Sequence, residues 1–105
     1  MHGGDMYRQG DVLLIPVPSV PTKVSKISQG HLVLAEGEAT GHAHVIDSPT
    51  ARLFRSAPDE RFIQLAEKSL LRHEEHSRIE LPAGNYRVVI QREFVRSGEV
   101  RPVND

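Results

Sequence analysis

The sequence predicts an all-β fold, either a small antiparallel β-barrel or a sandwich. Three observations predict it: short runs with strand composition recur along the chain, turn residues separate them, and no stretch has the periodicity of an amphipathic helix. A barrel would also remove exposed strand edges, which helps a chain of only 105 residues.

The first half of the chain contains a lead and several strand candidates. Residues 1–8 are polar and glycine-containing, so we expect a flexible lead before a single β domain over residues 9–105. Prolines 16, 18 and 21 predict an edge or a loop, and Pro49 predicts the end of a strand. Residues 24–30 are expected to be a connector. The strand candidates are short and apolar: residues 11–17, 31–36, 42–47 and 51–55.

The second half carries the clearest local pattern. Apolar residues alternate with polar ones on both sides of Pro82-Ala83-Gly84-Asn85, whose residue types favour a turn, so residues 78–91 are predicted to form a β-hairpin. Residues 61–66 and 69–73 are further strand candidates, followed by a charged corner at Glu74-Glu75. Residues 100–103 predict a last short edge strand.

Composition excludes several functional classes. The chain has 13 basic and 14 acidic residues, which argues against a strongly basic nucleic-acid binder. It has no cysteine, so disulfides, thiolate zinc sites and cysteine nucleophiles are excluded. The phosphate-loop and serine-hydrolase motifs are absent. The chain has no apolar run of about 20 residues and no signal-peptide pattern, so we expect a cytoplasmic protein that does not span a membrane.

Four of the six histidines form two tight pairs. His42 and His44 are two residues apart, so on a strand both imidazoles point to one face and make half of a metal site. In the second pair, His73 shares the strand parity of Leu71 and is expected to point inward, whereas the parity of His76 predicts solvent. The remaining two histidines are isolated. We expect His2 to be disordered and His31 to lie at the surface at the end of a strand.

These pairs predict a site for a divalent transition metal (Zn, Fe, Mn, Ni or Cu) with His42, His44, His73 and His76 as ligands. Glu75 has the parity of His73, so it is either a carboxylate ligand or the partner of an imidazole. If the site is catalytic, the metal activates water or polarises a substrate oxygen, and Glu38 or Glu75 is the candidate base. In a metal-free alternative, Glu36 and Glu38 act with His42 and His73 as general acid and base in hydrolysis or isomerisation.

The chain resembles a family of small, uncharacterised bacterial and phage proteins. Five stretches carry the resemblance over nearly the whole chain: QGDVLL at residues 9–14, AEGEATGHAH at 35–44, HEEH at 73–76, LPAGNY at 81–86 and QREF at 91–94. The resemblance implies a cytoplasmic protein of about this length and supplies no activity.

A second, remote resemblance is to the cupins. Gly37 with His42 and His44 is similar to the first cupin motif, and Pro82 with Gly84 is similar to the second. Cupins place a glutamate soon after HxH, where this chain has only Asp47, and a histidine soon after PxG, where it has Arg87. His73 or Glu75 would therefore have to complete the ligand set. The resemblance implies a small β-barrel with an interior polar site.

The sequence leaves two other functional classes open. Four arginines near the C-terminus predict an alternative, metal-free RNA-, nucleic-acid- or protein-binding edge: Arg87, Arg92, Arg96 and Arg101. A small core with exposed strand edges also favours a homodimer. The favoured prediction is metal-assisted binding or chemistry of a small molecule or nucleotide. Whether the chain is an enzyme stays open.

Overall fold

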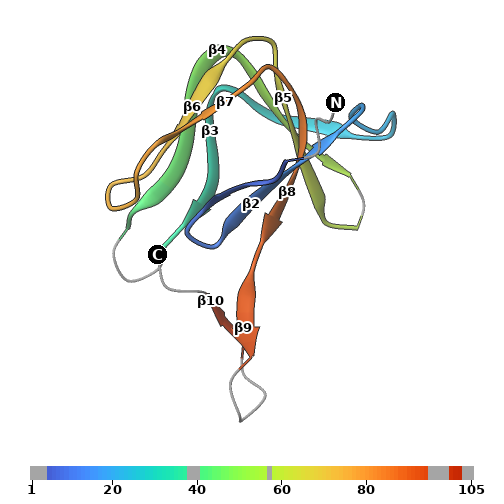
Figure 1. Cartoon of the computed structure of the whole chain (residues 1–105). Coiled ribbons are helices and arrows are strands. Elements are labelled where there is room, and N and C mark those ends of the chain that lie inside the picture. Colours follow the sequence, from blue (N-terminus) through green and yellow to red (C-terminus); the bar gives the residue numbers. More distant parts are fainter. Residues whose placement is uncertain (1–4, 38–40, 57, 95–99, 103–105) are drawn as a thin grey trace.

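The computed structural model describes residues 5–37, 41–56, 58–94 and 100–102, and its regular structure in these residues consists of strands without a helix (Figure 1). The all-β prediction is therefore confirmed. The strands are β1 (Tyr7–Gln9), β2 (Val12–Val17), β3 (Ser25–Glu36), β4 (Ala43–Ser56), β5 (Glu60–Leu65), β6 (Ser69–Arg72), β7 (Ile79–Leu81), β8 (Gly84–Ile90), β9 (Arg92–Phe94) and β10 (Val100–Pro102).

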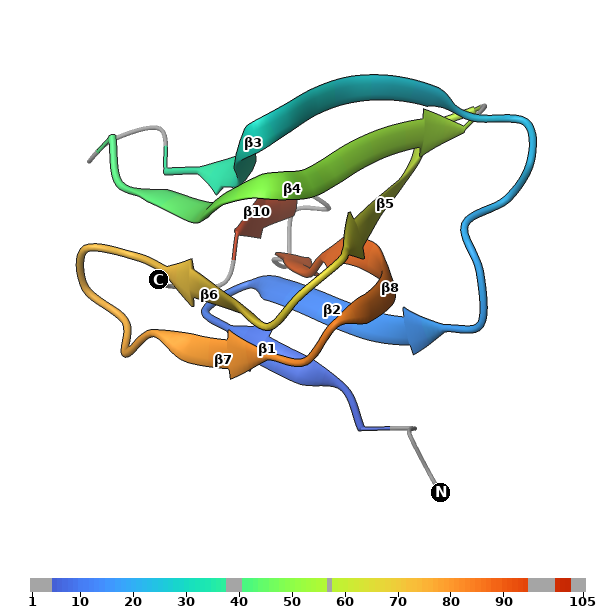
Figure 2. The same ribbon diagram turned by 90° about the horizontal axis from the view of Figure 1, so that it is seen from above.

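One antiparallel sheet contains the first eight strands and curls into a nearly closed barrel. Its strand order is β1-β2-β8-β5-β4-β6-β7, and β3 pairs along the other edge of β4. Figure 2 shows the long β3–β4 ribbon passing over the layer that contains β2 and β8. The predicted last strand is β10, which pairs with β9 in a separate two-stranded sheet. The barrel leaves β1 and β7 as the two ends of its strand order.

The side chain of Gln9 bridges these two ends. Its amide nitrogen donates hydrogen bonds of 3.0 Å to the carbonyl oxygens of Leu71 in β6 and Ser77 before β7. Gln9 is buried, so each of these bonds satisfies a polar group that would otherwise cost about 1–3 kcal/mol. The gap in the backbone ladder is thus closed by a side chain.

Alternation of apolar and polar residues places the core inside the curled sheet. In β8, Tyr86 and Val88 are buried while Arg87 is exposed. The main cluster draws on seven of the eight strands of the sheet: Val12, Leu14, Leu32, Leu34, Ile46, Ala51, Leu53, Ile63, Leu65, Leu71, Leu81, Tyr86 and Val88. Apolar side chains thus occupy the interior of the barrel. The buried polar side chains include Gln9, Asp11, His44 and His73.

Two sequence expectations in the β3–β4 ribbon are wrong. Residues 24–30 are not a connector, because Ser25–Gly30 form the first half of β3. Pro49 does not end a strand, because β4 runs through it. Gly30 pairs with Ser48 while Gln29 pairs with Arg52, so Pro49 lies in a bulge where no partner needs its missing N–H.

The predicted hairpin over residues 78–91 is also wrong in its pairing. Both strands exist, but β7 pairs with β6, and β8 pairs with β2 and β5. The turn at Pro82 joins strands in different parts of the barrel, and the Tyr86 hydroxyl donates a 2.6 Å hydrogen bond to the Pro82 carbonyl. Alternation identified the two strands correctly but carries no information about their partners.

The predicted lead overlaps the first strand. β1 begins at Tyr7, whose ring packs edge-on against Tyr86 with centroids 6.0 Å apart. Residues 1–4 lie outside the described residues, so the predicted boundary after residue 8 stays a prediction.

A polar network on the outer surface joins β3, β4 and β6. The Asp47 carboxylate is bonded by the Arg72 guanidinium, with Nε at 3.0 Å, and by His31 Nδ1 at 2.6 Å. The Arg72 hydrogen bond, followed by the His31 hydrogen bond, lowers the pKa of Asp47 below its ordinary value. His31 is at the surface, as predicted.

The lowered pKa of Asp47 predicts a pH-dependent contribution to stability. The contribution is fully present above the ordinary carboxyl pKa of about 4 and is lost as the pH falls through the lowered value. Asp47→Asn should therefore reduce the free energy of unfolding near pH 7, by less than about 1 kcal/mol because the pair is exposed. Urea denaturation of wild type and variant should show this difference in unfolding free energy near pH 7, and no difference at a pH below the lowered pKa of Asp47. An equal difference in unfolding free energy at both pH values would contradict this account.

Candidate functional site

His44 and His73 lie side by side at one end of the barrel. Val45 in β4 pairs with Arg72 in β6, and continuing this antiparallel register by one residue places His44 opposite His73. Their ring centroids are 4.3 Å apart, and both side chains are buried. The expectation that His73 points inward agrees with this placement.

His76 folds back onto this pair because the chain turns after β6. His73 Nδ1 accepts hydrogen bonds from the backbone N–H of Glu75 at 3.0 Å and of His76 at 3.3 Å. The His76 ring then lies 4.7 Å from the His73 ring and 5.9 Å from that of His44. The parity argument that placed His76 in solvent is wrong, because strand alternation ends with β6 at Arg72.

His42 completes a cluster of four histidine rings. It precedes β4, its side chain is 28% exposed, and its ring meets His73 edge-on with centroids 5.7 Å apart. Its Nδ1 lies 3.6 Å from a carboxylate oxygen of Glu75. The two sequence pairs, which are about thirty residues apart along the chain, thus converge in space.

Glu74 was not singled out by the sequence analysis and faces the same cluster. Its Oε1 accepts a 3.0 Å hydrogen bond from the Ala43 N–H, and this bond is the main cause that lowers the pKa of Glu74. One ligand atom from each of His42, His73 and Glu74 lies within 4.8 Å of the others. Glu74 adjoins Glu75 in the sequence, but strand alternation predicts that Glu74 points away from the face that His73 and Glu75 share.

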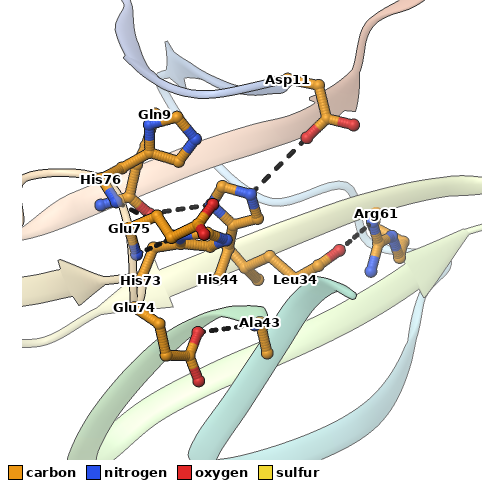
Figure 3. A network of polar contacts seen from close by, with 10 residues as sticks. All are labelled: Gln9, Asp11, Leu34, Ala43, His44, Arg61, His73, Glu74, Glu75 and His76. Atoms are coloured by element: carbon orange, nitrogen blue, oxygen red, sulfur yellow. Dashed lines mark hydrogen bonds and ion pairs between the residues drawn. The ribbon is translucent and has the colours of Figure 1, made fainter. Parts of the chain in front are cut away.

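Gln9 and Asp11 also belong to the site and were missed. His44 Nδ1 lies 2.8 Å from Gln9 Oε1, and His44 Nε2 lies 3.6 Å from Asp11 Oδ1 (Figure 3). The side chain of His44 is 0% exposed and that of Asp11 is 5% exposed. Two polar residues flanking Gly10, directly before a buried strand, were the available signal.

The hydrogen bonds assign different tautomers to the two buried histidines. The Gln9 amide nitrogen faces two carbonyl oxygens, so its own oxygen must face His44, and Nδ1 of His44 carries the proton. In His73, Nδ1 accepts from two backbone N–H groups, so the neutral ring carries its proton on Nε2. The neutral form of His44 therefore has its lone pair at Nε2, whereas the neutral form of His73 has its N–H donor there.

The other predicted site residues either lie outside this cluster or fall on residues or side chains that the structure does not describe. Glu38 and His2 lie outside the described residues, and Glu36 is exposed. Arg87 forms an ion pair of 3.2 Å with Glu60. The side chains of Arg92, Arg96 and Arg101 are not described, so the predicted arginine-bearing edge stays a prediction.

Comparison with known proteins identifies a family and no activity. Within the described residues, no helix is long and apolar enough to cross a membrane. No curated protein and no solved structure matches the chain, so the cupin resemblance gains no support. A family model described as a domain of unknown function (DUF8820) matches residues 8–91 and includes both histidine pairs. The chain therefore belongs to the DUF8820 family.

Proposed function

We propose that this chain binds a divalent transition-metal ion at the histidine cluster. The observation that carries the proposal is the convergence of His42, His73 and Glu74, whose ligand atoms lie within 4.8 Å of one another. Two imidazoles and a carboxylate are a common ligand set for such ions. His44 and His76 stand beside this set with their rings against His73.

The donor atoms restrict which metals fit. Nitrogen and oxygen ligands suit Zn²⁺, Fe²⁺, Mn²⁺, Ni²⁺ and Cu²⁺, and the chain has no thiolate to favour softer ions. Glu75, 3.6 Å from His42 Nδ1, is placed to orient the His42 ring rather than to act as the base. Glu74 takes the ligand position that the sequence analysis offered to Glu75.

A bound metal would supply Lewis acidity for binding or activating a small molecule at this end of the barrel. The alternative, nucleic-acid binding through the C-terminal arginines, has less support because Arg87 is already neutralised by Glu60. The family membership is compatible with either function. The histidine cluster therefore remains the best-supported functional site.

The proposal predicts stoichiometric metal that depends on His42. Untagged protein reconstituted with Zn²⁺ and dialysed should retain metal by elemental analysis, and His42→Ala should lose at least about one equivalent because a ligand is removed. His31→Ala is the matched control, since His31 is an exposed histidine bonded to Asp47 outside the cluster, and it should bind as wild type does. Wild-type protein that stays metal-free with all five ions would overturn the proposal.

Recruitment of His73 as a ligand predicts a local change in the turn that follows it. A neutral His73 can bind metal only if its ring rotates or changes tautomer, because its Nδ1 lone pair is committed to the Glu75 and His76 amides. Amide exchange at Glu75 and His76, followed by NMR, should therefore accelerate on adding Zn²⁺ to wild type and not to His42→Ala. Unchanged exchange in metal-loaded wild type would remove His73 from the ligand set.

A further inference from the structure

Two arginines face each other across β4 and β5, at the opposite end of β4 from His44. Arg55 pairs directly with Arg61, and Leu53, which belongs to the core, pairs with Ile63 in the same register. Residues two apart on a strand share a face, so both arginines continue the inner face of the sheet toward its rim. The side chain of Arg61 is half-buried and that of Arg55 is exposed.

One hydrogen bond holds the Arg61 guanidinium in place. The register between β3 and β4 skips Leu34, and Arg61 Nη2 donates a 2.7 Å hydrogen bond to the Leu34 carbonyl (Figure 3). A carbonyl oxygen is neutral, so this bond fixes the guanidinium without cancelling its charge. The bond uses one N–H of the guanidinium and leaves the others for a ligand.

No ion pair offsets the charge of Arg55 or Arg61 in the part of the chain that the structure describes. The neighbouring Arg87 on β8, in contrast, lies 3.2 Å from Glu60. Like charges directly opposite each other destabilise a sheet, and a half-buried charge without a counter-charge costs more than an exposed one. Burial, followed by the charge of Arg55, lowers the pKa of Arg61, and the exposed Asp59 only partly opposes this.

We propose that Arg55 and Arg61 together bind a phosphate group, either as inorganic phosphate or as part of a small molecule. Guanidinium groups match phosphate with parallel N–H···O bonds, and a phosphate has enough oxygens to bond two guanidiniums at once. Near pH 7 a phosphate carries about one to two negative charges, so it offsets two arginines better than a single carboxylate does. The site shares no residue with the histidine cluster, and the proposal is therefore independent of metal binding there.

Phosphate titration of the ¹⁵N-labelled chain, followed by NMR at the arginine Nε–H resonances, tests the site directly. With the ionic strength held constant by chloride, inorganic phosphate should shift the Arg55 and Arg61 resonances along a saturable curve. Arg55→Gln changes an exposed side chain, so it should fold, and it should weaken phosphate binding at least about tenfold because one guanidinium is lost. Arg87→Gln, which removes an exposed arginine paired with Glu60, is the matched control and should bind phosphate as wild type does.

A ribonucleoside monophosphate distinguishes the two sources of the phosphate group. Binding at least about tenfold tighter than that of inorganic phosphate, without competition from the nucleoside alone, would identify a phosphorylated small molecule as the ligand. Equal affinities would identify inorganic phosphate. Either result requires that the same Arg55 and Arg61 resonances shift.

Thermal unfolding distinguishes a ligand site from an arginine pair that only supports the fold. In buffer without phosphate, Arg55→Gln should unfold at a higher temperature than wild type because the repulsion across β4 and β5 is removed. Added phosphate should then raise the unfolding temperature of wild type by more than that of the variant. An equal rise in both would overturn the proposal. So would the absence of a saturable shift in wild type, or a shift of the Arg87 resonance as large as those of Arg55 and Arg61.

Discussion

The side-chain amide of Gln9 is the contact on which both the barrel and its polar end depend. Its nitrogen donates to Leu71 and Ser77 across the gap between the ends of the sheet, and its oxygen accepts from His44. Closure of the barrel and orientation of a buried imidazole are therefore one event. A side chain that could only donate would leave His44 Nδ1 without its acceptor. A side chain that could only accept would leave the Leu71 and Ser77 carbonyls without their donor.

The polar end of the barrel is graded from buried to exposed. Asp11 and His44 lie innermost, His73 stands beside His44, and His42 and Glu75 face solvent in part, with side chains 28% and 54% exposed. The two buried imidazoles are held in different ways. The ring of His44 is oriented by the side chain of Gln9, whereas His73 also stabilises the turn after β6. Metal binding that recruits His73 should therefore be coupled to local rearrangement of this turn.

Sequence reasoning was reliable wherever strand alternation decides the outcome. It predicted an all-β fold, either a barrel or a sandwich, and it placed the imidazole of His73 on the inner face. It failed at His76 and Glu74 because alternation ends with β6 and a turn brings these residues back. It failed for the hairpin around Pro82 because alternation identifies strands without choosing their partners. Gln9 and Asp11 were missed for a different reason. Gln9 acts through Leu71 and Ser77, which are 62 and 68 residues away, and no local pattern contains that contact.

The tautomer of His44 in the metal-free protein tests the central claim most directly. Long-range ¹H–¹⁵N correlation spectra of ¹⁵N-labelled chain near pH 7 distinguish a protonated Nδ1 from a protonated Nε2. The account predicts a proton on Nδ1 in wild type, with this preference relaxed in Gln9→Leu. A proton on Nε2 alone would contradict it, because Gln9 Oε1 could then accept no hydrogen bond from Nδ1 and would not orient the ring.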